Sequence, residues 1–301
     1  MKVLVTGATG LIGSALCDAL LARDDEVVGL SRDPGRAGRA QPGVRWHAWE
    51  PTLERPSAAA FEGVDGVVNL VGEKINQRWT AEAKQRIMES RRTATHNLVG
   101  AIAGLQERPR VLVNQSAVGY YGDRGDAVVD ESTGAGSSFD AEVVRAWEQA
   151  AREIEGADVR LVITRTGQVL DAEGGLLAEL LTPFRLGVGG PIAGGNQYLS
   201  WIHRDDEVGL LLWALDDERV SGAVNATSPN PATNHDFSKA LGRALGRPAV
   251  PPVPGFVLDL KFGREFGGVL RGGQRVVPKR AQELGFEFRH PELDEALGSL
   301  L

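Results

Sequence analysis

The 301-residue sequence contains a single cysteine, Cys17, so no disulfide can form within the chain. No apolar run approaches the ~18 residues that a membrane-spanning helix needs. The first residues, MKVLVTGATGLI, lack a cleavage site of small residues, which predicts no signal peptide. Together these absences predict a cytoplasmic protein without a membrane partner.

Acidic residues also outnumber basic ones, 40 to 33. The formal net charge of −7 argues against a nucleic-acid partner, because neutralising phosphates requires a basic surface. The five histidines show no spacing typical of metal ligands, so we expect no metal site. Hydrophobic residues make up 42% of the chain and charged residues 24%, as in an ordinary globular protein, and we expect a small molecule as its partner.

The first half of the chain alternates short apolar runs with helical patterns. The runs within 2–7, 26–32, 63–72 and 110–117 are rich in valine and leucine, which is typical of strands buried on both faces of a parallel sheet. Longer helical patterns separate them. This alternation predicts an α/β fold with a Rossmann-type, doubly wound parallel sheet. We expect the dinucleotide-binding domain to span 1–170, with 196–228 returning to it.

The remaining residues, 171–301, are predicted to form a smaller C-terminal substrate lobe. DAEGGLL (171–177) and GVGGPIAGGNQ (187–197) are predicted loops, because glycine and turn residues dominate them. PAVPPVPGF (248–256) indicates an extended connector, since proline disfavours helix. Helices are expected within 256–266, 278–285 and 290–301.

A glycine-rich turn joins the first predicted strand to the first helix in KVLVTGATGLIGSAL. Gly7 permits a tight turn, Gly10 lets backbone amides approach a pyrophosphate, and Gly13 lets helix and strand pack closely. We therefore predict that this turn and the start of the helix bind a dinucleotide, or, as the alternative, form a tight turn only. The residues assigned to it are Gly7, Thr9, Gly10, Leu11, Ile12 and Gly13.

The end of the second predicted strand distinguishes between two dinucleotides. A free ribose 2′-hydroxyl calls for an acidic residue there, but the sequence places Ser31 and Arg32 at this point. The Arg32 guanidinium can pair with a 2′-phosphate and stack on adenine, which favours NADP(H) over NAD(H). Asp33 follows directly and keeps NAD(H) open, and an exposed surface arginine is the alternative.

Several separate motifs extend this pattern over the whole chain. SAVGYYG (116–122), RTGQVL (165–170) and GGQRVVPKRAQELGFEFRHPELDEAL (272–297) join the glycine turn in resembling the atypical NAD(P)-dependent epimerase-family proteins. These proteins belong to the extended short-chain dehydrogenase/reductase superfamily and carry a small C-terminal module. The resemblance implies a Rossmann fold and an NADP(H) cofactor.

The resemblance also implies further cofactor contacts. Leu70, Val71 and Gly72 match a segment that passes the cofactor ribose, Arg91 a helix residue that faces the cofactor, and Val169 a position near the nicotinamide. Each has a structural alternative: apolar strand core for Leu70 and Val71, and a solvated helix charge for Arg91.

The catalytic tyrosine and lysine of the superfamily are missing from FDAEVVRAWE (139–148), where Asp140 and Val144 stand instead. The nearest polar candidates are Ser116, Tyr120 and Tyr121, which we predict as catalytic; Glu131 and Asp140 are alternative proton handlers. We expect an NADP(H)-dependent oxidoreductase or epimerase acting on a small carbonyl or sugar-like compound. The alternative is a non-catalytic NADP(H) sensor or interaction protein.

Overall fold

The computed structural model describes residues 1–249 and 251–301. Seven parallel strands form its central sheet in the order β11-β7-β5-β4-β1-β2-β3. These strands are β1 (Lys2–Thr6), β2 (Glu26–Ser31), β3 (Arg45–Ala48), β4 (Gly66–Asn69), β5 (Val111–Ala117), β7 (Arg160–Thr166) and β11 (Gly222–Ala226). Their valine-rich stretches are buried on both faces, which confirms the predicted doubly wound Rossmann-type sheet.

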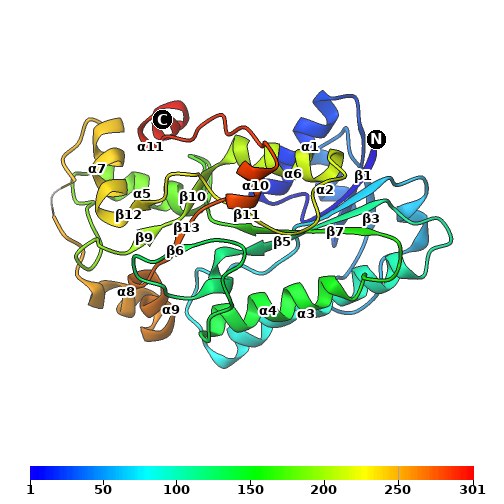
Figure 1. The fold of residues 1–301 in the computed structure, drawn as a ribbon, viewed down its shortest axis with the longest axis horizontal. Coiled ribbons are helices and arrows are strands. Elements are labelled where there is room, and N and C mark those ends of the chain that lie inside the picture. Colours follow the sequence, from blue (N-terminus) through cyan, green and yellow to red (C-terminus); the bar gives the residue numbers. More distant parts are fainter. Residues whose placement is uncertain (250) are drawn as a thin grey trace.

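Helices cover both faces of the sheet (Figure 1). One apolar core contains residues of α1 (Leu11–Ala22) and α6 (Arg204–Asp216), and α2 (Pro34–Ala40) lies nearby. On the other face, α3 (Ala81–Ala103) and α4 (Phe139–Arg152) run side by side beneath the sheet. Short 3-10 turns, η1 (Ala58–Phe61) and η2 (Val118–Tyr121), follow β3 and β5 along the chain.

A smaller group of elements lies beyond the carboxyl ends of the strands (Figure 1). Its apolar core joins α5 (Gly175–Arg185), α7 (Asn234–Ala244) and α11 (Leu293–Leu300). The remaining elements are α8 (Gly255–Phe262), α9 (Arg264–Arg271), α10 (Lys279–Glu283), β6 (Val128–Val129), β8 (Gln168–Leu170), β9 (Tyr198–Leu199), β10 (Trp201–His203), β12 (Ala232–Thr233) and β13 (Arg275–Val276). The boundary between a nucleotide domain and a substrate lobe at residue 170 stays a prediction.

The structure corrects two expectations for this region. The predicted loop over 171–177 contains the start of α5, because leucines at 176, 177, 180 and 181 give it an apolar helical face. The helix expected over 256–266 is divided into α8 and α9, since Gly263 adopts a positive φ of 82° that ends the first helix. Of the predicted connector 248–256, Val250 lies outside the described residues.

One buried carboxyl group lies between the sheet and α6. Glu207 is fully buried; the Thr166 hydroxyl donates to its Oε1 at 2.9 Å, and its Oε2 has no hydrogen-bond partner among the described residues. Burial, opposed by the Thr166 hydrogen bond, raises the pKa of Glu207 from 4.5 to about 8.

The proton on the Glu207 carboxyl group makes folding stability depend on pH. The unfolded chain loses this proton near pH 4.5 and the folded chain near pH 8. The contribution of the bound proton to the unfolding free energy is therefore full below pH 4.5 and is lost as pH rises through 8. We expect the unfolding free energy of wild type to fall relative to Glu207→Gln by about 1.4 kcal/mol per pH unit in this window. Urea titrations across the window measure it, with exposed Glu62→Gln as control. Parallel curves for wild type and Glu207→Gln would contradict the bound proton.

Candidate cofactor and active site

The glycine-rich turn brings β1, α1 and the end of β4 into backbone contact. Gly7 has a φ of 63°, and a Cβ there would lie 2.7 Å from the Leu70 carbonyl oxygen. A Cβ at Gly13 would collide with the carbonyl oxygen of Gly7. No other residue type fits either position without moving the backbone.

The start of α1 is open to an anion. Its N-cap is Gly10, which makes no side-chain cap, and its first turn carries no acidic residue. The amide groups of this turn and the positive end of the helix dipole are therefore available to a phosphate. Thr9 and Gly10 are exposed, and Leu11 and Ile12 are half-buried beside them. The site fits the pyrophosphate of a dinucleotide.

The end of β2 explains how an arginine and an aspartate can share one turn. The Asp33 carboxylate caps α2 by accepting the Arg36 amide at 2.9 Å, and the Asp33 amide donates to the Ser31 hydroxyl at 3.1 Å. Arg32 is exposed and forms no ion pair within the part of the chain that the structure describes. The carboxylate is thus engaged by its own helix, while the guanidinium remains available to a ligand.

A row of buried polar side chains fixes the end of β4. The Thr6 hydroxyl donates to the Asn69 side-chain oxygen at 2.6 Å and accepts the Leu70 amide at 3.1 Å. Asn69 in turn donates to Thr95 at 3.0 Å and to Asn114 at 2.6 Å. These bonds hold the backbone of Leu70 beside the glycine turn. The cofactor is predicted to pass along this edge of the sheet.

Arg91 of α3 reaches the same edge. Its guanidinium lies 5.1 Å from the Trp147 ring centroid and would be 3.1 Å from a Cβ at Gly72. Burial lowers the pKa of Arg91 to about 10, only partly opposed by the charge of Glu73. Its one hydrogen bond among the described residues, to the Ile87 carbonyl, is long at 3.4 Å. A largely buried cation with so few partners suits a bound polar ligand.

A buried ion pair connects α4 to the sheet. Arg165 donates to both carboxylate oxygens of Glu148, at 2.8 and 2.9 Å, and both side chains are about 4% exposed. Burial acts to lower the pKa of Arg165, but the hydrogen bonds and charge of Glu148 outweigh it, so the pKa is raised. A two-point pair of this kind fixes the position of the helix as well as its charge.

Two of the three predicted catalytic hydroxyls form hydrogen bonds with this ion pair. The Ser116 hydroxyl donates to Glu148 at 2.7 Å. The Tyr121 hydroxyl accepts from Arg165 at 3.0 Å and donates to Asn225 at 2.7 Å, and burial raises the pKa of Tyr121 to about 12. These contacts favour positioning roles for Ser116 and Tyr121, so their catalytic role stays a prediction that the geometry does not support.

Tyr120 differs from its neighbour. It is half-buried, its ring lies under the Arg165 guanidinium at 3.5 Å, and its hydroxyl makes no hydrogen bond within the described residues. Of the three predicted catalytic side chains, it is the one with a hydroxyl available to a substrate. Glu131, an alternative proton handler, instead accepts the amides of Asn225 and Arg280 at 2.9 and 3.2 Å.

Val169 and His203 lie on the paired strands β8 and β10. Val169 is half-buried, and its approach to a nicotinamide stays a prediction. His203 caps α6 through its Nδ1, which accepts the Asp205 amide at 3.0 Å, and its Nε2 lies 3.2 Å from the Ser299 hydroxyl. Burial and the charge of His290, whose ring stacks on it at 3.9 Å, lower the pKa of His203.

The structure also brings together His203, Asp205 and His290, whose possible metal-ligating atoms lie within 4.8 Å of one another. Their spacing in the sequence gave no sign of this. Both ring nitrogens of His203 already contact protein groups, which leaves neither of them free for a metal in this arrangement. The absence of a metal site therefore stays a prediction.

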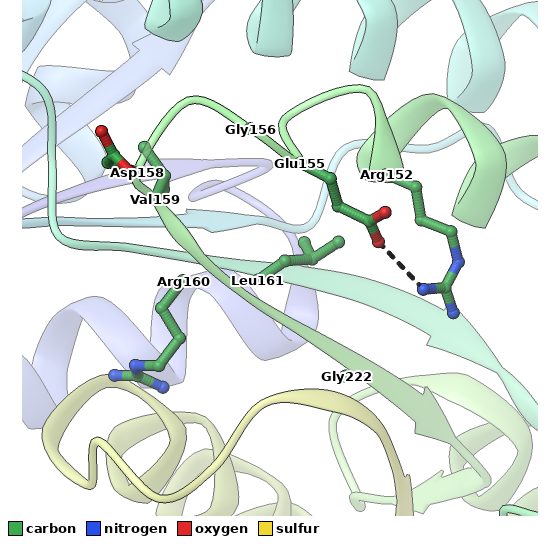
Figure 2. Close-up of a pocket in the computed structure, with 8 residues that line it drawn as sticks. All are labelled: Arg152, Glu155, Gly156, Asp158, Val159, Arg160, Leu161 and Gly222. Atoms are coloured by element: carbon green, nitrogen blue, oxygen red, sulfur yellow. Dashed lines mark hydrogen bonds and ion pairs between the residues drawn. The ribbon is translucent and has the colours of Figure 1, made fainter.

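Two hollows lie at the opposite edge of the sheet. One of about 470 Å³ is lined by the start of β7 and the end of α4 (Figure 2). Arg152 and Glu155 pair with each other at 3.2 Å on its α4 side, while Arg160 donates to carbonyls at the end of α6. A second, of about 410 Å³, adjoins Met1 and Arg110. Ligands of doubly wound folds bind at the carboxyl ends of the strands, so neither hollow matches that position.

Fold and glycine turn together define a Rossmann-type dinucleotide-binding protein. Residues 3–226 match the NAD dependent epimerase/dehydratase family, and residues 253–300 match DUF1731, a domain of unknown function. The chain belongs to the NAD-dependent epimerase/dehydratase family. No helix in the described residues is both long and apolar enough to cross a membrane.

The most informative relatives match the chain over its full length. Human epimerase family protein SDR39U1 is 39% identical over 305 residues, covering 100% of both chains, and a Mycobacterium tuberculosis epimerase family protein is 40% identical over 297 residues, covering 98% and 96%. The crystal structure of human SDR39U1 with NADPH superimposes with a TM-score of 0.90 at 38% identity, covering 100% of this chain and 99% of that one. A nucleoside-diphosphate sugar epimerase from Corynebacterium glutamicum gives 0.81 at 32% identity, covering 100% and 58%.

Breaking the buried pair should be costly. In Arg165→Met, Glu148 is left charged and without its cation, and we expect a loss of about 3–5 kcal/mol in unfolding free energy. The double variant with Glu148→Leu should regain most of it, because no uncompensated charge remains. Chemical denaturation measures both. Arg243→Met, which breaks the exposed pair with Asp294, is the matched control and should cost less than about 1 kcal/mol. Equal losses at the two sites would contradict this account.

Proposed function

We propose that this protein binds NADP(H) along the carboxyl ends of β1, β2 and β4 and acts as an oxidoreductase or epimerase on a small carbonyl or sugar-like compound. The observation that carries the proposal is the pairing of an open, glycine-lined helix start with an unpaired Arg32 beside a capped Asp33. The NADPH held by human SDR39U1 supports the same cofactor.

Each part of the cofactor contacts a different set of residues. The first turn of α1 holds the pyrophosphate through its backbone amides, and Gly7 and Gly10 let the phosphates approach the backbone closely. Arg32 and Ser31 hold the 2′-phosphate. The segment 70–72, Arg91 and Val169 lie along the path to the nicotinamide. Bound NADPH supplies a hydride, and the chain supplies orientation, exclusion of water and a proton.

A second function is the alternative to an oxidoreductase or epimerase. The missing tyrosine and lysine, together with the engaged hydroxyls of Ser116 and Tyr121, favour a non-catalytic NADP(H) sensor or interaction protein. The exposed Arg185 and the glycine-rich segment 187–195 instead favour an enzyme with an anionic or sugar-like substrate. NADPH that binds tightly but is not oxidised by any of a panel of carbonyl compounds would favour the sensor. A cytoplasmic location stays a prediction.

The cofactor assignment is tested at Arg32. We expect calorimetric titration to give tighter binding of NADPH than of NADH, and Arg32→Ala to weaken NADPH binding by about 10- to 150-fold, since a charge-assisted bond contributes roughly 1.5–3 kcal/mol.

Arg36→Ala, at an exposed arginine in the first turn of α2 and outside the predicted site, is the matched control for surface charge. NADH binding should change little in either variant. An Arg32→Ala variant that retains the full preference for NADPH would contradict the assignment, and a wild type that binds neither dinucleotide would contradict the proposal itself.

A further inference from the structure

The first turn of α4 contains a buried acid that the contacts described so far leave without a function. Asp140 is 6% exposed, and its Oδ1 has no hydrogen-bond partner among the described residues. Its Oδ2 would lie 3.2 Å from a Cβ at Gly119, so the carboxyl group rests on η2. This 3-10 turn directly follows the carboxyl end of β5, the edge at which ligands of this fold bind.

Asp140 is one of two polar groups on one side of α4 that lack a full set of partners. Trp147 Nε1 is also buried without a hydrogen bond in the described part of the chain. Asp140 and Trp147 are seven residues apart, two helical turns, and so share a face. Buried polar groups are normally paired, and a run of unpaired ones points to a ligand or ordered water that completes them.

This face continues to the proposed cofactor contacts. The ring of Trp147 lies under the Arg91 guanidinium, which in turn lies over Gly72 at the end of β4. Val144, one turn along from Asp140, is buried and apolar and offers no competing charge. Trp147, on the same face of α4 as Asp140, therefore joins that face to Arg91 and Gly72.

Burial raises the pKa of Asp140, and the Ser138 hydroxyl and the amides of Asp140 and Ala141 oppose that rise only in part. The neighbouring elements carry several titratable groups, among them Lys84 and Arg91 on α3, Tyr120 and Tyr121 on η2, Arg165 on β7, and Glu142 and Glu148 on α4 itself. None of them contributes to the shift. A raised pKa favours the protonated form of a carboxyl group, which is the form that can donate a proton.

We propose that Asp140 is the acid that protonates the substrate oxygen, in the place where the sequence lacks a tyrosine. The inference rests on the proposed function. In the direction of reduction, the carbonyl carbon gains a hydride, which NADPH supplies, and the π electron pair moves to the oxygen. That oxygen takes the proton from the Asp140 carboxyl group. The products are an alcohol, NADP⁺ and an Asp140 carboxylate, which regains a proton from water.

The inference is tested first by proton release on cofactor binding, which requires no substrate. NADP⁺ carries a positive nicotinamide ring and NADPH a neutral one, so only NADP⁺ should favour the Asp140 carboxylate. Calorimetric titrations of the full chain in two buffers of different ionisation enthalpy, over a range of pH, count the protons. We expect wild type to release more protons with NADP⁺ than with NADPH.

The variants separate Asp140 from its surroundings. Asp140→Asn should remove the difference in proton release, while Glu142→Gln, an exposed acid on the same turn, should leave it intact. Equal proton counts for the two cofactors in wild type would overturn the role of Asp140 while leaving NADP(H) binding in place. Failure of wild type to bind either cofactor would overturn the proposed function and this inference with it.

Turnover gives an independent readout with isatin, an activated dicarbonyl probe. Removing a general acid should lower kcat by about a hundred- to ten-thousandfold in Asp140→Asn with little change in NADPH affinity. Tyr120→Phe tests the rival donor. Loss of turnover in Tyr120→Phe together with full turnover in Asp140→Asn would overturn the inference in favour of Tyr120. Where isatin is not reduced by wild type, the proton count decides.

Discussion

The pair of Arg165 and Glu148 holds the active edge of this protein together. It joins α4 to β7, and its hydrogen bonds extend to Ser116 on β5 and to Tyr121 on η2. Through Tyr121 the network reaches Asn225 on β11, which donates to the Val277 carbonyl in the C-terminal segment. Five neighbouring elements and the C-terminal segment are thus fixed by one buried pair whose members must both be present.

This network explains why hydroxyls at the mouth of the sheet need not be catalytic. A serine at the end of a strand and a tyrosine in the following turn have the right position for chemistry, but here both are required to satisfy a buried charge. The groups outside this network are Tyr120, whose ring packs against the Arg165 guanidinium, and Asp140, on the turn of α4 nearest to η2. Both candidate proton donors are therefore separate from the hydrogen bonds that hold the elements together.

Most of the fold could be predicted from the sequence, because most strands of the central sheet are apolar runs and each glycine of the first turn has a backbone requirement. The longer helical patterns of the first half of the chain include the segments that form α3 and α4. The lobe was harder: glycine at 174 and 175 suggested a loop where α5 begins, and Gly263 divides one apolar pattern into two helices.

The candidate site could be predicted only where its residues are local. The turn 7–13 and the Ser31–Asp33 segment are short patterns with a direct physical meaning. In contrast, the buried network draws on four distant segments of the chain, through Ser116, Glu148, Arg165 and Asn225. Their spacing in the sequence does not indicate that they are in contact. The sequence likewise places an acidic residue at position 33. It does not show that the Asp33 carboxylate caps α2 by accepting the Arg36 amide, because that contact exists only in the folded turn.

The central claim is that one dinucleotide lies along the carboxyl edge of the sheet and ends beside η2 and α4. Hydrogen–deuterium exchange with and without NADPH tests it most directly. The account predicts slower exchange at 7–13, 31–32, 70–72 and 117–121 and in the first turn of α4, with no change at 152–161 around the hollow at the opposite edge. Protection confined to 152–161, or none at 7–13, would contradict it.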